Sequence, residues 1–134
     1  MPEGWPASGE IDIMEMVGYD PNKSHGTIHS KAYNHKINTQ KGATTYVNGA
    51  SDEFHTYSLD WNSKNIKIYV DGKQYFGFFN DGKNNHDTWP FNHGMPIIIN
   101  NAIGGDWGGQ KGIDDGAFPN NYIIDYVKVY EPNP

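Results

Sequence analysis

Three carboxylic acids lie within a single short stretch, residues 9–15, which reads "GEIDIME". Alternation along a β-strand would place Glu10 and Asp12 on one face and Glu15 on the opposite face, with the isoleucines. One extra residue in the strand, a β-bulge, would reverse the alternation and return Glu15 to the face of the other acids. The stretch therefore predicts a bulge at Ile13-Met14 and a row of three acids.

A row of acids on one sheet face is suited to acid–base chemistry, because mutual repulsion raises the pKa of one carboxyl group above the others. Two glutamates of this length, Glu10 and Glu15, can bring their carboxyl groups to roughly 5 Å apart, the separation needed for glycoside hydrolysis with retention of configuration. The competing interpretation is three solvated acids on an outer face. Four tryptophans favour the first interpretation, since flat apolar rings stack on sugars.

Composition narrows the class of protein. The chain has 134 residues, which fits one domain, and 14% aromatic residues with 16 glycines, which favours an all-β fold. The net charge of −6 and the absence of arginine argue against a nucleic-acid partner. There is no cysteine, so thiol chemistry is excluded. No apolar run approaches membrane-spanning length, and no signal peptide is recognisable, so no membrane partner is expected.

The elements that must position the acids are strands. Apolar and alternating runs between turn residues predict an antiparallel β-sandwich, with one helical turn near 86–91. The run at 96–102 is typical of a strand buried on both faces. Asp71-Gly72 predicts a two-residue hairpin turn, and Trp61 and Trp89 are expected in the core. One domain over 1–131 and a linker from 132 to 134 are expected, with strands near 10–17, 25–31, 44–47, 54–61, 66–70, 73–79, 96–102 and 122–130.

The stretch "WPASGEIDIMEMVGYDP" resembles the active-site strand of glycoside hydrolase family 16, in its laminarinase (endo-β-1,3-glucanase) branch. The blocks "HGTIHSKAYNH", "FHTYSLDW", "IYVDGKQYF", "PIIINNAIGGDWGG" and "YIIDYVKVYE" follow in the family's order. The resemblance implies a jelly-roll, concanavalin-like β-sandwich. It also implies retaining, endo-acting, extracellular hydrolysis of β-1,3-glucan (laminarin) or of mixed-linkage β-1,3-1,4-glucan by double displacement.

The resemblance assigns roles to the acids and to their neighbours. It implies that Glu10 is the nucleophile, Glu15 the general acid/base and Asp12 the assisting carboxylate. Trp5 resembles a cleft-wall residue, and His29 resembles a residue beside the catalytic acids. A core position for Trp5 and a purely structural, hydrogen-bonded role for His29 are the alternatives.

Three further residues complete the candidate set. Asn101 and Trp107 resemble substrate-binding residues of the cleft, and Trp107 lies among glycines on an expected loop. No cofactor is required for the expected catalysis, and no His/Asp cluster has zinc-like spacing along the chain. Asp125 interrupts the apolar run "YIIDYV" and matches a family ligand of structural Ca²⁺, whose other ligands normally come from segments N-terminal to this sequence.

The family domain normally begins well before its acid motif, so the sandwich is expected to be incomplete in this chain. Three explanations stay open: a truncation, a homodimer whose copies complete each other, or an N-terminal partner chain. The alternative to hydrolysis is a carbohydrate-binding β-sandwich fragment without turnover. A structural fragment that assembles with partners is a third possibility.

Overall fold

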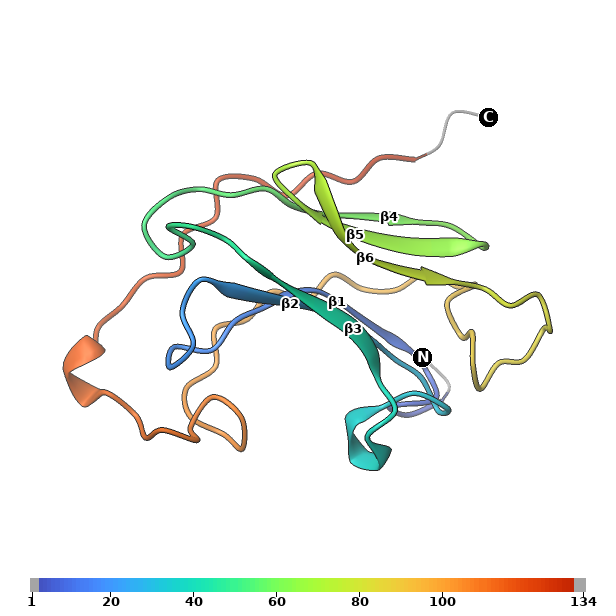
Figure 1. The fold of residues 1–134 in the computed structure, drawn as a ribbon, viewed down its shortest axis with the longest axis horizontal. Coiled ribbons are helices and arrows are strands. Elements are labelled where there is room, and N and C mark those ends of the chain that lie inside the picture. The colour runs from blue at the N-terminus through green and yellow to red at the C-terminus, as the bar shows by residue number, and fades with distance from the viewer. Residues whose placement is uncertain (1–2, 132–134) are drawn as a thin grey trace. The chain divides into compact units, whose positions relative to one another are not determined.

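The computed structural model describes residues 3–131 and forms two compact units, Met1–Ile97 and Ile98–Pro134. The first unit contains two three-stranded antiparallel sheets, which form separate layers (Figure 1). The first sheet consists of β1 (Glu10–Glu15), β2 (Lys23–His29) and β3 (Lys41–Tyr46). The second consists of β4 (Tyr57–Trp61), β5 (Asn65–Val70) and β6 (Lys73–Phe79). The predicted all-β antiparallel sandwich is confirmed.

The predicted hairpin joins β5 to β6. Val70 pairs with Lys73, so Asp71 and Gly72 form a two-residue turn. Both turn residues have positive φ, 49° and 77°, as a type I′ turn requires. The local sequence therefore sets the register of this strand pair.

The core of the first unit lies between its two sheets. Alternate residues of β5 point inward, and Ile66 and Ile68 are fully buried. The predicted core position of Trp89 is confirmed at 4% exposure, and Trp61 packs against the same cluster and donates from Nε1 to the Phe91 carbonyl at 2.9 Å. The buried cluster and the β1 side chains that pack on it are Ile28, Ile66, Ile68, Phe76, Trp89, Phe91, Ile11 and Ile13.

Two predicted strands do not form. The segments 96–102 and 122–130 have no regular secondary structure and belong to no sheet of the described chain. Ile98 is 78% exposed, so the expectation that this run is buried on both faces is wrong. A strand exists only when a neighbour pairs with it, which no local sequence pattern guarantees. Residues 86–88 form a single hydrogen-bonded turn, in which the backbone N–H of Trp89 donates to the carbonyl of Asn85 four residues earlier, so the one helical turn predicted near 86–91 forms but does not extend into a helix.

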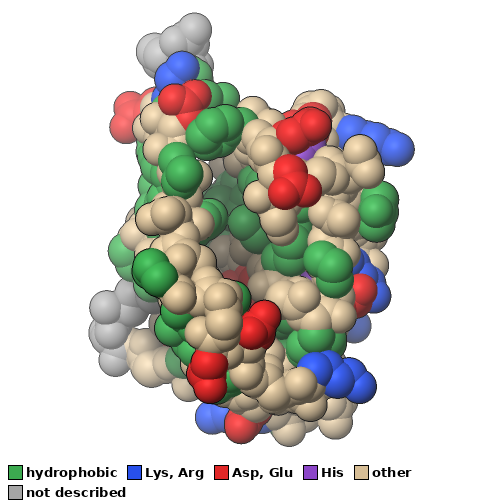
Figure 2. Space-filling model, turned by 90° about the vertical axis from the view of Figure 1, so that its left-hand side faces the viewer, with side chains coloured by type: hydrophobic (Ala, Val, Ile, Leu, Met, Phe, Trp, Pro, Cys, Tyr) green, Lys and Arg blue, Asp and Glu red, His purple; other side chains and the backbone are tan. Residues whose placement is uncertain are grey.

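The second unit has little regular structure. It contains turns over 104–111 and one short 3₁₀ helix, η2 (Asp115–Ala117). Hydrophobic side chains lie open on the surface (Figure 2). Among the described residues, no helix is long and apolar enough to cross a bilayer. The expected linker at 132–134 lies outside the described residues, and the single domain over 1–131 stays a prediction. Exposed large hydrophobic residues of this unit include Ile98, Ile103, Ile113, Tyr122, Ile123, Tyr126, Val127, Val129 and Tyr130.

Candidate active site

Strand β1 contains the predicted β-bulge. Asp12 lies opposite Thr27 of β2, whereas Glu15 lies opposite His25, so three steps along β1 match two steps along β2. The extra residue reverses the alternation beyond it. The Glu15 carboxylate consequently interacts electrostatically with both Asp12 and Glu10. The predicted bulge and the shared acid face are confirmed.

The carboxyl group of Glu15 holds a proton up to neutral pH. Its pKa is raised from an ordinary 4.5 to about 7. Partial burial is the largest cause, because removal from water disfavours the charged form, and the charges of Asp12 and Glu10 raise the pKa further. Such a group can donate a proton near neutral pH and later accept one from water.

Glu10, at the other end of the row, lies beside an indole donor. Partial burial, followed by the charge of Asp12, raises the pKa of Glu10, whereas a hydrogen bond from Trp5 and the charge of His29 lower it. The pKa is raised on balance. The hydrogen bond runs from Nε1 of Trp5 to Oε2 of Glu10. Trp5 is 36% exposed, so it flanks the acids and is not a core residue.

His29 lies where the sequence predicted, beside the acids. Its Nε2 lies 3.4 Å from Oδ2 of Asp12, an ion-pair contact at the long end of the hydrogen-bond range. Burial lowers the pKa of His29, but the contact with Asp12 and the charges of the three acids outweigh burial and raise the pKa. A protonated imidazole at this position offsets part of the negative charge of the row.

The loop after β2 brings two more side chains to Trp5. The His35 ring centroid lies 4.9 Å from that of Trp5, and Nζ of Lys36 lies 4.9 Å from the same ring. His35 also contacts His29 edge-on at 5.3 Å. The buried amide of Asn34 donates to two backbone carbonyls of the loop and accepts from the Lys36 N–H, which fixes the short helix η1 (His35–Ile37). Sequence reasoning missed His35 and Lys36, because only tertiary contact joins them to Trp5.

Three of these residues form a possible metal cluster. Glu10, Asp12 and His29 each offer one ligand atom within 4.8 Å of the others. Spacing along the chain indicated no such cluster, so the fold created it. A zinc ion would hold each ligand atom about 2.0–2.2 Å from itself. In this structure the side chains contact other groups instead: Glu10 accepts a hydrogen bond from Trp5, and Asp12 contacts His29 directly. We therefore assign the cluster to acid–base chemistry.

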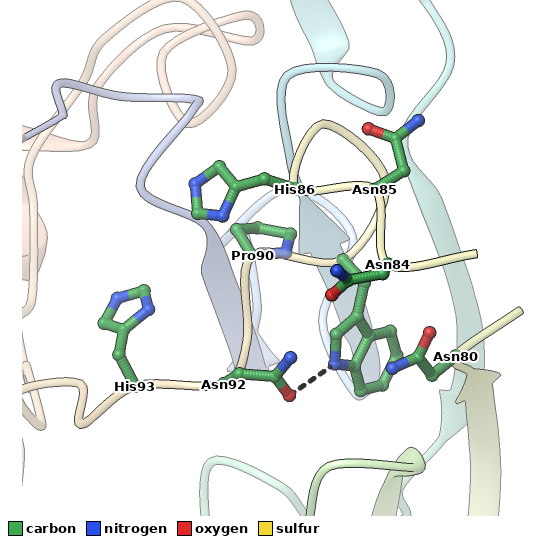
Figure 3. A pocket seen from close by; sticks show the side chains of 8 residues that line it. Asn80, Asn84, Asn85, His86, Pro90, Asn92 and His93 are labelled. Atoms are coloured by element: carbon green, nitrogen blue, oxygen red, sulfur yellow. Dashed lines mark hydrogen bonds between the residues drawn. The ribbon is translucent and has the colours of Figure 1, made fainter. Parts of the chain in front are cut away.

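None of the three acids is among the residues that line a pocket of about 300 Å³ on the segment after β6 (Figure 3). In this pocket Nε1 of the Trp89 indole donates to Oδ1 of Asn92 at 3.0 Å. The indole is stacked on Phe78 at 5.5 Å and Trp89 is only 4% exposed, so it presents no open face to a sugar ring. We assign no function to this pocket. It is lined by Asn80, Asn84, Asn85, His86, Trp89, Pro90, Asn92 and His93.

The remaining site residues predicted from the sequence all lie in the second unit. Nδ2 of Asn101 lies 3.4 Å from Oδ1 of Asn120. Trp107 lies in a turn between glycines, as its sequence predicted, and its carbonyl accepts from the Gln110 N–H. Asp125 is exposed on a segment without regular secondary structure. The substrate-binding roles of Asn101 and Trp107 stay predictions.

The fold and the site define an antiparallel β-sandwich whose bulged strand carries a carboxylate acid–base site. Residues 1–128 match glycosyl hydrolases family 16, and the chain belongs to this family. A β-glucanase of Rhodothermus marinus is 45% identical over 94% of this chain and 46% of its own length. The chain thus spans about half the length of this relative.

Solved structures show the same likeness. The laminarinase from Rhodothermus marinus matches with a TM-score of 0.85 and 42% identity, over 89% of this chain and 50% of that one. SCLam, a non-specific endo-β-1,3(4)-glucanase from family GH16, matches with a TM-score of 0.76 and 52% identity, over 87% of this chain and 43% of that one. The expected jelly-roll class of sandwich is confirmed by these neighbours.

Proposed function

We propose that the chain carries the catalytic acids of an enzyme that hydrolyses internal β-1,3 linkages of glucan with retention of configuration. The observation that carries this proposal is the bulge in β1. It brings Glu15, whose pKa is about 7, onto the face of Glu10 and Asp12. The similarity to a laminarinase and to a β-1,3(4)-glucanase supports β-glucan as the substrate and leaves both pure and mixed linkages open.

The mechanism assigns one task to each acid. The Glu15 carboxyl proton passes to the glycosidic oxygen while the Glu10 carboxylate attacks the anomeric carbon, which breaks the glycosidic bond and forms a glycosyl ester. Glu15, now ionised, takes a proton from water, and the resulting hydroxide displaces Glu10. The Trp5 indole N–H stabilises the negative charge of Glu10 in the resting and product states. Asp12, held by His29, keeps the proton on Glu15 through its own charge.

Hydrolysis of laminarin by single variants tests the proposal. Glu10→Gln and Glu15→Gln should each reduce turnover by about a hundredfold or more. Glu53→Gln, which changes an exposed glutamate outside the site, is the matched control. Equal activity of Glu10→Gln and the control would overturn the proposal.

Chemical rescue by azide separates the two glutamates. With an activated aryl glucoside, Glu15→Ala should yield the β-glucosyl azide, because azide attacks the glycosyl ester on Glu10. Glu10→Ala should yield the α-glucosyl azide by direct displacement. The opposite pattern of products would make Glu15 the nucleophile and Glu10 the general acid/base.

Binding without turnover is the second candidate function. The half-exposed Trp5 ring beside the acids offers a stacking surface for a sugar, and binding requires no proton transfer. Calorimetry with laminarin oligosaccharides distinguishes the two functions. Binding by an unmodified chain that hydrolyses nothing would favour the carbohydrate-binding fragment.

We also propose that further polypeptide covers the exposed apolar segments 97–99 and 122–130, and that it comes from the part of the domain that a truncation would remove, from a second copy of this chain, or from an N-terminal partner chain. These segments expose several large hydrophobic side chains, among them Ile98 at 78% and Tyr130 at 81%. Exposed runs of this kind favour association. Mass in solution tests the homodimer, and a monomer would exclude it.

Two further expectations rest on the resemblance. A glucan polymer is too large to enter a cell, which supports an extracellular site of action. Ca²⁺ takes six to eight oxygen ligands, and Asp125 offers a single exposed carboxylate. Calcium binding at Asp125 stays a prediction, which a melting curve with and without chelator tests.

A further inference from the structure

The bulge in β1 is contacted from the opposite sheet. The hydroxyl of Tyr75, on β6, donates a hydrogen bond of 3.0 Å to the backbone carbonyl of Ile13. Ile13 lies in the stretch between Asp12 and Glu15 where the register between β1 and β2 slips. A bulge interrupts the regular ladder of the strand, so a donor from outside the sheet can fix its conformation.

The neighbouring strand makes room for this contact. A Cβ atom at Gly26 of β2 would lie 2.8 Å from the Tyr75 hydroxyl oxygen and 3.0 Å from two carbons of its ring. Gly26 pairs regularly with Ala43 and has no positive φ, so its backbone does not require glycine. The missing side chain serves to admit Tyr75. The fully buried Ser24 lies on the same strand, with its Oγ 3.4 Å from the Tyr75 hydroxyl.

We propose that Tyr75 is a positioning residue, which ties the bulge of β1 to the second sheet and thereby keeps Glu15 on the face of Glu10 and Asp12. The proposal rests on the proposed function only for its effect on turnover. The proposed orientation of the Glu15 side chain does not depend on that function. Burial raises the pKa of Tyr75, so the hydroxyl keeps its proton and stays a donor throughout the range in which Glu15 titrates.

The titration of Glu15 reports on this arrangement without any turnover. The charged groups that act on Glu15 are Asp12 and Glu10 on its own strand and His29 on β2, and Tyr75 from β6 lies close enough to feel its charge. If the bulge relaxes, Glu15 leaves the face of the other acids, and because a carboxylate is costly to bury beside Ile11 and Ile13, this last residue of β1 turns into solvent, where it loses both burial and the repulsion of the other acids. Its pKa must then fall toward 4.5.

The experiment compares Tyr75→Phe and Gly26→Ala with Tyr69→Phe by a carbon-13 NMR titration of the Glu15 carboxyl group. Tyr69 is the matched control, because it is also a half-buried tyrosine of the second sheet but alternates with the inward-facing residues of β5. Tyr75→Phe should lower the Glu15 midpoint by about one pH unit or more, and Tyr69→Phe should leave it unchanged. Gly26→Ala, which keeps every hydrogen-bonding group but blocks the ring, should lower it as well.

A folded Tyr75→Phe chain with an unchanged Glu15 midpoint would overturn the proposal. If Tyr75→Phe does not fold, Gly26→Ala decides the question by the same measurement. Measurement of turnover, beside the Glu15 midpoint, tests the positioning role and the proposed function separately. In an active chain, Tyr75→Phe should lower kcat about tenfold or more with little change in KM. A chain that never hydrolyses glucan but shows the shifted midpoint would refute the function and keep the positioning role.

Discussion

Glu10 lies directly opposite His29 in the antiparallel pairing of β1 with β2. Side chains at opposite positions on one face are neighbours, which accounts for the attraction between the carboxylate and the imidazole. His29 also contacts Asp12 and acts on Glu15, so one cation acts on all three acids and offsets part of their charge. The protonation of the row therefore depends on this histidine.

Replacement of His29 by glutamine should shift the pH dependence of activity upward. The imidazole lowers the pKa of both Glu10 and Glu15, so its loss raises both. The acid limb of the profile follows ionisation of the nucleophile and the alkaline limb follows deprotonation of the acid, so both limbs move to higher pH. Profiles of kcat/KM for His29→Gln and for the exposed control His86→Gln provide the measurement. An unshifted profile would show that His29 is only structural.

Glu15 should make the chain less stable as the pH rises. Its folded pKa of about 7 lies above the ordinary 4.5, so its contribution to stability is fully present below pH 4.5 and is lost as the pH rises through 7. Glu15→Gln should therefore raise the free energy of unfolding by about 1 kcal/mol near pH 8, after allowance for solvent screening, and change it little near pH 4. Urea unfolding at both pH values, with Glu53→Gln as the control, measures the effect. Equal effects at the two pH values would contradict it.

Trp5→Phe should distinguish the effect of the indole N–H donor from the effect of the aromatic ring. The indole N–H lowers the pKa of Glu10, so its removal should move the acid limb of the pH profile upward. The phenyl ring keeps an aromatic surface beside His35, so KM should change by no more than about threefold. Trp5→Ala removes both features and should raise KM as well. A phenylalanine variant with an unaltered acid limb would show that the indole hydrogen bond does not tune the nucleophile.

Ile66→Ala should test the core that supports the site. Ile66 is fully buried between the two sheets, and its truncation should cost about 2–5 kcal/mol of the free energy of unfolding. Ile37→Ala is the matched control, because Ile37 is 56% exposed. Thermal or urea unfolding gives both values. Similar losses for the two variants would show that the sheets do not pack around Ile66.

Local patterns in the sequence determined the features that depend on near neighbours. The misfit of Glu15 in the alternation of "GEIDIME", together with the family resemblance, predicted the bulge, and Asp71-Gly72 predicted the hairpin, because alternation and turn geometry are properties of a few consecutive residues. The resemblance to family 16 placed His29 beside the acids. Each of these predictions concerns residues on one strand or on two adjacent strands.

Only the tertiary structure decided the contacts between distant segments. It brought His35 to Trp5, created the cluster of Glu10, Asp12 and His29, and carried the Tyr75 hydroxyl to the bulge. It also left 96–102 and 122–130 outside both sheets, although their sequences are typical of strands. Apolar alternation makes a segment able to pair, but the hydrogen bonds of a strand come from a neighbour, and the fold alone supplies that neighbour.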